Sequence, residues 1–560
     1  MEIYRTEHPR PQLRRDSYIC LNGEWDFAID KSLSGKDRKL YCQRELGMKI
    51  IVPFCPESEL SGIGEKDFLG QVWYHKTVTV SRGDNRAILH FGACDYYTDV
   101  WVNGTPVGKH KGGYTPFEFD ITDYVNDGDN DITVCAYDPV KNTDQPSGKQ
   151  SMAYQPSGCM YTRTTGIWQT VWMEYVPHAY VTHLKMTPVI ADSSLIVEVE
   201  TVCGDGNVLT LTASKDGKPC GEKSITITGS KATAILKIDD LRLWSHDDPF
   251  LYDLTVTLGD DRVYSYFGMR EITWTDGIIH INGNPVFQRL VLDQGFYPDG
   301  IYTAKTEDDL VRDIDLAMGL GFNGARLHQK IYEERFLYHC DRLGYLVWGE
   351  FPSWGADGNR AETWRNFLPE WLEELRRDYN HPAIIGWCPQ NETRNSTNYD
   401  FTKMLADMTH AYDATRPFIE TSGFTHIPEL TDIVDAHDYE NDPEKCHDNY
   451  ARLANGEAVV FGREDKALRP TFNSEYGSLW CAVNDETHGH RLMITLSQAL
   501  DTFRTTTTEM LKCPKMGGFC FTQLIDVEIE YNGIYTYWRE PKFDPAVIRE
   551  IVSQKAAIEE

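Results

Sequence analysis

Short runs of alternating apolar and polar residues fill the first third of the chain. Val100-Trp101-Val102 is followed by Asn103-Gly104 and then by Thr105-Pro106-Val107, and Asn-Gly between two apolar runs is a strong signal for a β-hairpin. No long helical period interrupts these runs. The pattern predicts a β-sandwich of the jelly-roll type over residues 1–178.

A more regular β pattern follows this first segment. Leu195-Ile196-Val197-Glu198-Val199 and Leu254-Thr255-Val256-Thr257-Leu258 are two of its strand candidates, and Gly and Asp-Gly turns separate them from their neighbours. About 90 residues with this rhythm are typical of an immunoglobulin-like sandwich. We therefore expect such a domain over residues 179–269.

Beyond about residue 270, short apolar runs alternate with amphipathic helical stretches. The clearest helical stretches cover residues 307–320, 333–342, 361–379 and 401–412. Eight strand candidates begin at Val286, Ala325, Tyr345, Ile384, Pro417, Ile433, Thr471 and Gly518. Eight strands alternating with helices over ~290 residues predict a C-terminal (β/α)8 TIM barrel over residues 270–560.

Charge and composition narrow the class of protein. The 560 residues include 55 Lys and Arg against 85 Asp and Glu, a net charge of −30, which disfavours binding to nucleic acid or to anionic membranes. No apolar run reaches the ~18 residues of a membrane span, and the N-terminus lacks the apolar core of a signal peptide. The 14 cysteines contain no C-x-x-C pair. We expect a cytoplasmic protein without cofactor or metal.

Two glutamates follow predicted barrel strands, where barrel enzymes carry their chemistry. Glu392 ends the run Trp387-Cys388-Pro389-Gln390-Asn391-Glu392 after the fourth strand, and Glu475 lies in Phe472-Asn473-Ser474-Glu475 at the seventh. Two carboxyl groups that flank one bond suit glycoside hydrolysis, since one protonates the leaving oxygen while the other attacks the anomeric carbon. Taken singly, each glutamate could instead be a solvated or salt-bridged loop residue without a catalytic role.

Several motifs, in order along nearly the whole chain, resemble glycoside hydrolase family 2, which contains β-galactosidases, β-glucuronidases and β-mannosidases. The segments that carry the resemblance are Leu21-Asn22-Gly23-Glu24-Trp25, Thr165-Gly166-Ile167-Trp168-Gln169, Leu243-Trp244-Ser245, Gly321-Phe322-Asn323 with Arg326, Asn380-His381-Pro382-Ala383-Ile384 and Asn391-Glu392. The resemblance implies the three domains predicted above and a hydrolase active on carbohydrate.

The resemblance also implies roles for individual residues. Glu392 would be the general acid and base, and Glu475 the nucleophile. Asn391 would hold a sugar hydroxyl near the reacting carbon, and Arg326 would hydrogen-bond the nucleophile and lower its pKa. His437 and Tyr439, after the sixth strand, are expected near the nucleophile, although a structural hydrogen bond is nearly as good an explanation.

Further substrate-binding candidates surround the predicted mouth. Tyr476 and Trp480 are expected to stack on the sugar, with core packing as the equal alternative, while Asp293 and Gln294 are expected to bind hydroxyls of the terminal sugar. His328 lies in Leu327-His328-Gln329-Lys330, where many family members carry Ser-His-Tyr-Pro after the arginine, and Gln523 or Thr522 stands where many carry Trp. These two departures lie in the substrate pocket and leave the sugar open.

The sequence thus predicts an exo-acting, retaining β-glycosidase. Asp526, Glu528 and Glu530 follow the eighth strand without the Asn-x-Lys motif by which family β-glucuronidases bind a uronate, so a neutral pyranoside is expected, with a β-galactoside first. A β-galacturonide, a β-glucuronide and an α-L-arabinopyranoside remain alternative substrates. A basic group such as Lys330 or Arg539 is an alternative means of binding a uronate carboxylate. The rivals are an inactive carbohydrate-binding protein and a metal-dependent hydrolase, and association into a homo-oligomer is undecided.

Overall fold

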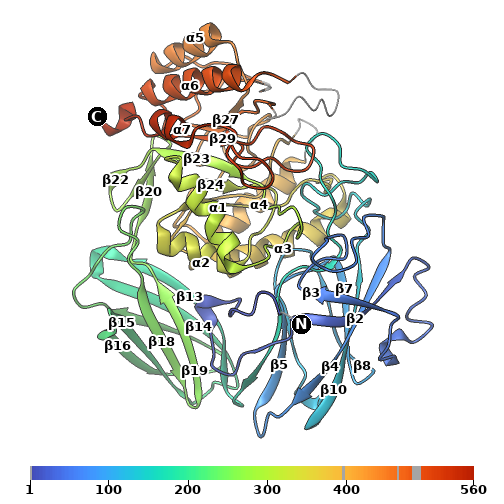
Figure 1. Ribbon diagram of the computed structural model, residues 1–560. Helices are drawn as coiled ribbons and strands as arrows, with labels where there is room; N and C mark the ends of the chain where they lie inside the picture. Colours follow the sequence, from blue (N-terminus) through green and yellow to red (C-terminus); the bar gives the residue numbers. More distant parts are fainter. Residues whose placement is uncertain (1–2, 394–397, 463, 465, 482–492) are drawn as a thin grey trace.

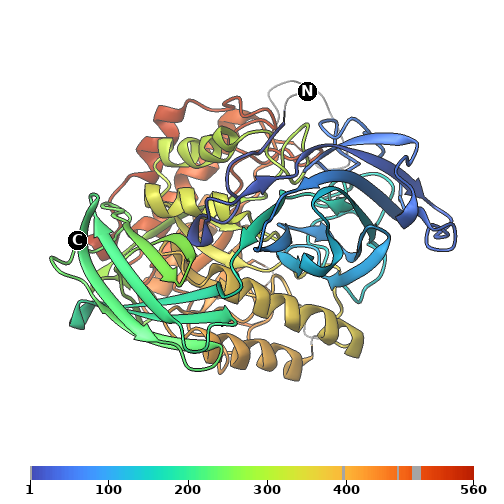
Figure 2. The ribbon, with the colours of Figure 1, turned by 90° about the horizontal axis from the view of Figure 1, so that it is seen from below.

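The computed structural model describes residues 3–393, 398–462, 464, 466–481 and 493–560. It has three parts: a C-terminal barrel lies above two β-sandwiches, the jelly roll on one side and the immunoglobulin-like domain on the other (Figure 1). The view from below shows the two sandwiches side by side against the barrel (Figure 2). The predicted fold class is confirmed.

The N-terminal jelly roll packs a sheet of order β1-β12-β5-β9 against one of order β3-β2-β4-β10-β7-β8, with β11 paired to β6. The Asn-Gly hairpin forms as predicted: Val102 of β7 pairs with Thr105 of β8, and Asn103 and Gly104 have φ of 51° and 75°, both positive as a type I′ turn requires. The strands are β1 Ile19–Cys20, β2 Gly23–Asp30, β3 Met48–Val52, β4 Gln71–Val80, β5 Arg86–Phe91, β6 Cys94–Asp95, β7 Tyr97–Val102, β8 Thr105–Lys111, β9 Phe117–Asp120, β10 Gly128–Tyr137, β11 Gly166–Ile167 and β12 Val171–Val176.

The middle domain is a sandwich of sheets β13-β14-β17 and β16-β15-β18-β19. Strand alternation explains its core: Tyr252, Leu254, Val256 and Leu258 are buried while the residues between them are not, because successive side chains of a strand point to opposite faces. Its strands are β13 Tyr180–Val189, β14 Ser194–Val202, β15 Val208–Lys215, β16 Lys218–Thr226, β17 Lys231–Lys237, β18 Tyr252–Leu258 and β19 Asp261–Phe267.

A small sheet, β20 to β22, leads into the barrel, whose strands pair in parallel in the order β26-β25-β24-β23-β29-β28-β27. The strands are β20 Ile272–Thr275, β21 Ile278–Ile281, β22 Asn284–Pro285, β23 Gln288–Asp293, β24 Gly324–Leu327, β25 Leu346–Glu350, β26 Ile384–Cys388, β27 Asp435–Asp438, β28 Phe472–Gly477 and β29 Gly518–Thr522. The helices are α1 Glu307–Gly319, α2 Glu334–Leu343, α3 Ala361–Asp378, α4 Tyr399–Tyr412, α5 Pro443–Ala454, α6 Leu496–Lys512 and α7 Pro545–Val552.

The fifth predicted strand does not form a regular strand in the described part of the chain. Phe418 makes only an isolated parallel bridge to Trp387 of β26. Its N–H donates to the side chain of Asp432 at 2.9 Å, and Pro417 has no N–H to donate. The segment keeps two backbone bonds to Trp387 of β26, each 3.0 Å long, whereas toward β27 the side chain of Asp432 replaces the ladder. The first and sixth strands begin two residues later than predicted, at Gln288 and Asp435.

No helix in the described residues is long and apolar enough to cross a membrane. The loop between β10 and β11 leaves the jelly roll and contacts the barrel: the N–H of Ser147 donates to the carbonyl of Trp354 at 2.8 Å. Trp354 follows β25, so this loop reaches the carboxyl ends of the barrel strands, where polar side chains converge.

Candidate active site

A cavity of about 540 Å³ opens at the carboxyl ends of the barrel strands, the face at which barrel enzymes place their active sites. Its size is ordinary for a small-molecule site. Glu392 and Glu475 both line it, and a carboxylate oxygen of each lies within 4.8 Å of the other and of a ring nitrogen of His437. The structure thus brings together the two glutamates that the sequence singled out.

Glu475 lies on β28 and is held as a carboxylate. Arg326 donates to its Oε1 at 3.3 Å, and the hydroxyl of Tyr439 donates to its Oε2. Burial alone would raise the pKa of Glu475, but the charges of His437, His328 and Arg326 outweigh burial and hold the pKa well below its usual range. An ionised carboxylate facing a cavity is suited to nucleophilic attack.

Glu392 follows β26 and is connected to Glu475 through His437. Nδ1 of His437 lies 3.0 Å from Oε1 of Glu392, and its Nε2 lies 3.7 Å from Oε1 of Glu475. Burial lowers the pKa of His437, but the charge of Glu475 and the hydrogen bond to Glu392 raise it above its ordinary value overall. A protonated imidazole at this position stabilises the negative charge of Glu475.

Arg326, on β24, is oriented by Glu350 at the end of β25. It donates to Oε2 of Glu350 through Nε at 3.1 Å and through Nη2 at 2.6 Å. Burial opposes ionisation of Glu350, yet Arg326 and His328 lower its pKa to about 2. This buried, hydrogen-bonded pair fixes the guanidinium beside Glu475.

The side-chain amide of Asn391 has a hydrogen-bond partner at its oxygen but none at its nitrogen among the described residues. Its Oδ1 accepts from Nη2 of Arg326 at 3.0 Å, whereas its buried Nδ2 has no acceptor among the described residues. A buried amide N–H without a partner is costly, so a ligand oxygen at this point would be stabilised. The geometry fits the predicted role of holding a sugar hydroxyl.

The other predicted residues divide into those at the cavity and those away from it. His328, Tyr439 and Trp480 line the cavity. Tyr476 does not: its hydroxyl bonds Thr507 at 2.7 Å, and its ring packs on Phe519 and Phe521. Glu475 and Tyr476 are successive residues of β28, so they point to opposite faces. Tyr476 is a core residue, and its expected role as a sugar platform is corrected.

Asp293, Gln294 and Gln523 form a buried group that is not part of the cavity wall. Nε2 of Gln294 donates to Oε1 of Gln523 at 2.7 Å, and Oδ1 of Asp293 accepts from the N–H of Gly295 at 2.9 Å. Burial raises the pKa of Asp293 to about 6. The expected direct contact of these three side chains with the sugar is not reproduced, although Thr522, next to Gln523, does line the cavity.

Sequence reasoning missed Lys149 and Cys159, which come from the jelly roll and line the cavity. It also missed Ser422, whose hydroxyl lies 3.0 Å from Nε2 of His437 and donates to Asp435 at 2.7 Å. None of these residues follows a barrel strand inside a recognisable motif, so only the tertiary contact reveals them.

Glu392, His437 and Glu475 also have the donor atoms and the spacing that a metal ion would need. Two of these atoms, Nδ1 of His437 and Oε1 of Glu392, are already 3.0 Å apart as a hydrogen bond. The expectation of a metal-independent site therefore stays a prediction, which a chelator tests.

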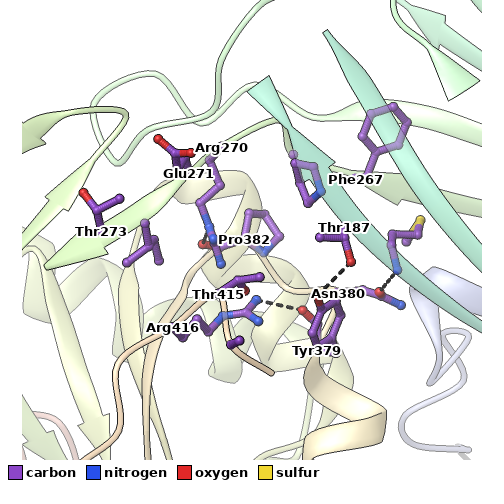
Figure 3. A pocket seen from close by; sticks show the side chains of 15 residues that line it. Thr187, Phe267, Arg270, Glu271, Thr273, Tyr379, Asn380, Pro382, Thr415 and Arg416 are labelled. Atoms are coloured by element: carbon purple, nitrogen blue, oxygen red, sulfur yellow. Dashed lines mark hydrogen bonds between the residues drawn. The ribbon is translucent and has the colours of Figure 1, made fainter. Parts of the chain in front are cut away.

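A second cavity, of about 250 Å³, lies between the immunoglobulin-like domain and the amino ends of the barrel strands (Figure 3). Its two arginines hold backbone: Arg270 donates to the carbonyls of Pro382 and Ile384, and Arg416 donates to that of Tyr379 at 2.7 Å. Thr187 and Tyr379 add a hydroxyl pair at 2.8 Å. The side chains that line this cavity are therefore engaged in contacts that connect the two domains.

Three family models match the chain in order. They are described as the sugar binding domain of glycosyl hydrolases family 2, over residues 19–173, as glycosyl hydrolases family 2, over residues 179–270, and as the TIM barrel domain of that family, over residues 275–484.

Similar proteins include glycosidases of two kinds. A β-galactosidase of Thermoanaerobacter pseudethanolicus is 30% identical over 400 residues, which cover 67% of this chain and 51% of that protein. A β-glucuronidase of Rattus norvegicus is 29% identical over 476 residues, which cover 74% of this chain and 69% of that protein. This chain therefore spans about half the length of the first relative. A β-glucuronidase from Ruminococcus gnavus in complex with D-glucuronic acid shares the fold, with a TM-score of 0.82 over 99% of this chain and 100% of that one at 19% identity.

Proposed function

Because the chain belongs to glycosyl hydrolase family 2, we propose that it is an exo-acting, retaining β-glycosidase. The observation that carries the proposal is the pair Glu392 and Glu475 at one cavity, with carboxylate oxygens within 4.8 Å. Retaining glycosidases place their two carboxyl groups about 5–5.5 Å apart, whereas inverting enzymes need about 6.5–9.5 Å to admit a water. The close pair supports retention.

In the first step, Glu475 attacks the anomeric carbon while Glu392 donates a proton to the glycosidic oxygen. The bond between that carbon and oxygen breaks, the aglycone leaves as an alcohol, and a glycosyl ester forms on Glu475. His437 occupies one oxygen of Glu392, so the other oxygen carries the transferable proton. Arg326 and Tyr439 keep the attacking carboxylate in place.

In the second step, Glu392 acts as a base. It takes a proton from water as the water oxygen attacks the anomeric carbon, and the bond to Glu475 breaks. Two inversions at one carbon restore the β configuration. The available N–H of Asn391 supports a hydrogen bond to a sugar hydroxyl, which lowers the barrier if it strengthens in the transition state.

The test is covalent trapping. An aryl glycoside of a fluorinated sugar should form a long-lived ester, and peptide mass spectrometry should locate the sugar on Glu475. Glu475→Gln should not be labelled and should lose at least about 1,000-fold in kcat, while the control Glu429→Gln, an exposed loop glutamate, should behave like the wild type. Labelling of another residue, or release of the α-anomer first in proton NMR, would contradict the proposal.

Two sugar classes are supported for this site. The sequence predicts a neutral pyranoside such as a β-galactoside, because acidic residues follow the last strand. However, Asp526 is paired with Lys542 at 2.9 Å, and Glu528 accepts from the N–H of Thr162 at 3.0 Å, so less free negative charge faces a substrate than the sequence alone suggests. β-Glucuronidases among the relatives support a uronide as the second class.

A further inference from the structure

Lys149 brings a cation from the jelly roll to the active-site cavity. It lies in the loop between β10 and β11, far in sequence from every barrel strand, yet it lines the cavity together with Glu392 and Glu475. Its side chain is otherwise enclosed, and only 5% of the residue is exposed. The ammonium therefore belongs to the wall of the site.

The backbone on both sides of Lys149 is fixed against the barrel. The N–H of Gly148 donates to the carbonyls of Trp354 at 3.1 Å and of Pro352 at 3.2 Å. The carbonyl of Lys149 itself accepts from the N–H of Tyr161 at 2.8 Å, and the Tyr161 hydroxyl donates to Glu530 in the barrel. The position of the lysine is thus determined by bonds to two barrel loops.

The Lys149 ammonium makes no hydrogen bond and no ion pair with any residue that the structure describes. Its neighbours are two rings, those of Trp354 and Tyr161, with Nζ 5.4 Å and 5.7 Å from their centroids. Burial alone would lower its pKa, but the charges of Glu530, Glu475 and Glu392 raise it overall, so the group stays protonated. Because the ammonium has no hydrogen-bond acceptor among the described residues, a substrate carboxylate that reaches it would form a charge-assisted hydrogen bond without displacing an existing partner.

Three other basic residues in the barrel loops are already occupied. Lys330 donates to the carbonyls of Gly295 at 2.6 Å and Tyr302 at 2.8 Å. Arg539 is paired with Asp313 at 2.9 Å, as Lys542 is with Asp526. Lys330 and Arg539 were the basic groups that the sequence suggested for holding a substrate carboxylate, and their contacts leave that task to Lys149.

We propose that Lys149 binds the carboxylate of a terminal uronic acid, so that the substrate class is a β-linked uronide. This rests on the proposed glycosidase function. Glu530 also faces the cavity, but it accepts hydrogen bonds from Tyr161 and, at 3.1 Å, from Asn532. These donors satisfy its oxygens, and Lys149 compensates its charge.

The test compares two variants on matched substrates that differ only in the sugar carboxylate. Aryl β-D-glucuronide and β-D-galacturonide are measured beside aryl β-D-glucoside and β-D-galactoside. Lys149→Met should lower the ratio of uronide to neutral kcat/KM by about 100-fold, as expected for loss of a charge-assisted pair, and Lys149→Arg should retain most of it. Lys141→Met is the control, because Lys141 is an exposed lysine of the same loop.

A second measurement needs only the wild-type enzyme. The methyl ester of the uronide should be cleaved about 100-fold less efficiently than the acid, since esterification removes the charge that Lys149 pairs with. Equal cleavage of acid and ester, or equal losses on neutral and acidic substrates in Lys149→Met, would overturn the role of Lys149 while leaving the glycosidase intact. No cleavage of any substrate and no labelling of Glu475 would instead refute the proposed function.

Discussion

Tyr439 stabilises the carboxylate form of the proposed nucleophile, Glu475. Its hydroxyl donates to Glu475, and burial keeps its own pKa well above the ordinary value, so it stays a donor. Tyr439→Phe should lower kcat/KM by roughly 10- to 100-fold, because a hydrogen bond to a charged group contributes about 1.5–3 kcal/mol.

The pH profile of Tyr439→Phe tests whether the tyrosine acts on the ionisation of Glu475. The lost donor stabilised the carboxylate form of Glu475, so its loss should raise the pKa of Glu475. The acidic limb of kcat/KM should then move to higher pH, because the protonated nucleophile cannot attack. Tyr399→Phe, at an exposed tyrosine, should leave the limb unchanged. A lower rate with an unmoved limb would show that Tyr439 acts elsewhere.

Glu392 should matter most when the leaving group needs a proton. Glu392→Gln should slow cleavage of alkyl glycosides by about 100- to 10,000-fold, the usual contribution of a general acid, but should affect the first step much less with activated aryl glycosides. Added azide should restore turnover, because this anion attacks the glycosyl ester without a base, and the product should be a β-glycosyl azide. Equal losses on both substrate types would contradict the acid role.

The two glutamates were predictable, since each lies in a short motif directly after a strand. Their connection through His437 was not, because it depends on β26, β27 and β28 meeting in the barrel with a particular register. Tyr476 illustrates the same limit: its aromatic ring and its place beside Glu475 fit a sugar platform, yet the alternation of β28 turns it toward Thr507 and the core.

At the scale of elements, hydrophobic periodicity located seven barrel strands and the first four helices to within a few residues. It failed at Pro417-Phe418-Ile419, where apolar residues suggested a strand but Asp432 competes for the backbone N–H of Phe418. A side-chain hydrogen bond of this kind leaves no trace in an apolar pattern, so its effect on the ladder was outside the reach of sequence reasoning.

At the same scale, the loop that carries Lys149 to the cavity needs a glycine at position 148. Its φ is +54°, and an added Cβ would lie 2.3 Å from the carbonyl oxygen of Gln329. Gly148→Ala should therefore cost more than the ~1–2 kcal/mol of a left-handed alanine, lower the Tm and reduce cleavage of uronides more than tenfold.

Gly158 provides the matched control for this prediction. It lies in the same loop with φ of +65°, but an added Cβ would meet nothing within 4 Å. Gly158→Ala should carry only the conformational cost and keep the substrate preference of the wild type. Equal effects of the two substitutions on the uronide would show that strain, and not displacement of Lys149, explains the loss.

At the scale of the whole molecule, the sequence predicted three domains but not how they share one site. Each domain follows from its own periodicity, whereas Lys149 reaches the cavity only because the jelly-roll loop is fixed to Trp354 and Pro352 of the barrel. Such contacts join residues about 200 positions apart, and no local pattern encodes them.

The interface between jelly roll and barrel should make stability depend on pH through Glu370. This residue of α3 is buried, its Oε1 accepts from the N–H of Tyr114 at 2.8 Å, and its Oε2 has no partner among the described residues. Burial raises the pKa of Glu370 from 4.5 to about 8, and the charge of Glu373 adds to the rise while the Tyr114 bond opposes it. The folded state therefore binds this proton more tightly than the unfolded chain.

A raised folded-state pKa means that this contribution to stability is complete below about pH 4.5 and is lost as pH rises toward 8. Glu370→Gln cannot ionise, so relative to wild type it should gain on the order of 2 kcal/mol between acidic and mildly alkaline pH. Melting curves over a pH series measure that difference, with Glu362→Gln, 45% exposed on the same helix, as the control. If the curves of wild type and Glu370→Gln stay parallel with pH, Glu370 is ionised throughout, and the domain interface tolerates a buried charge.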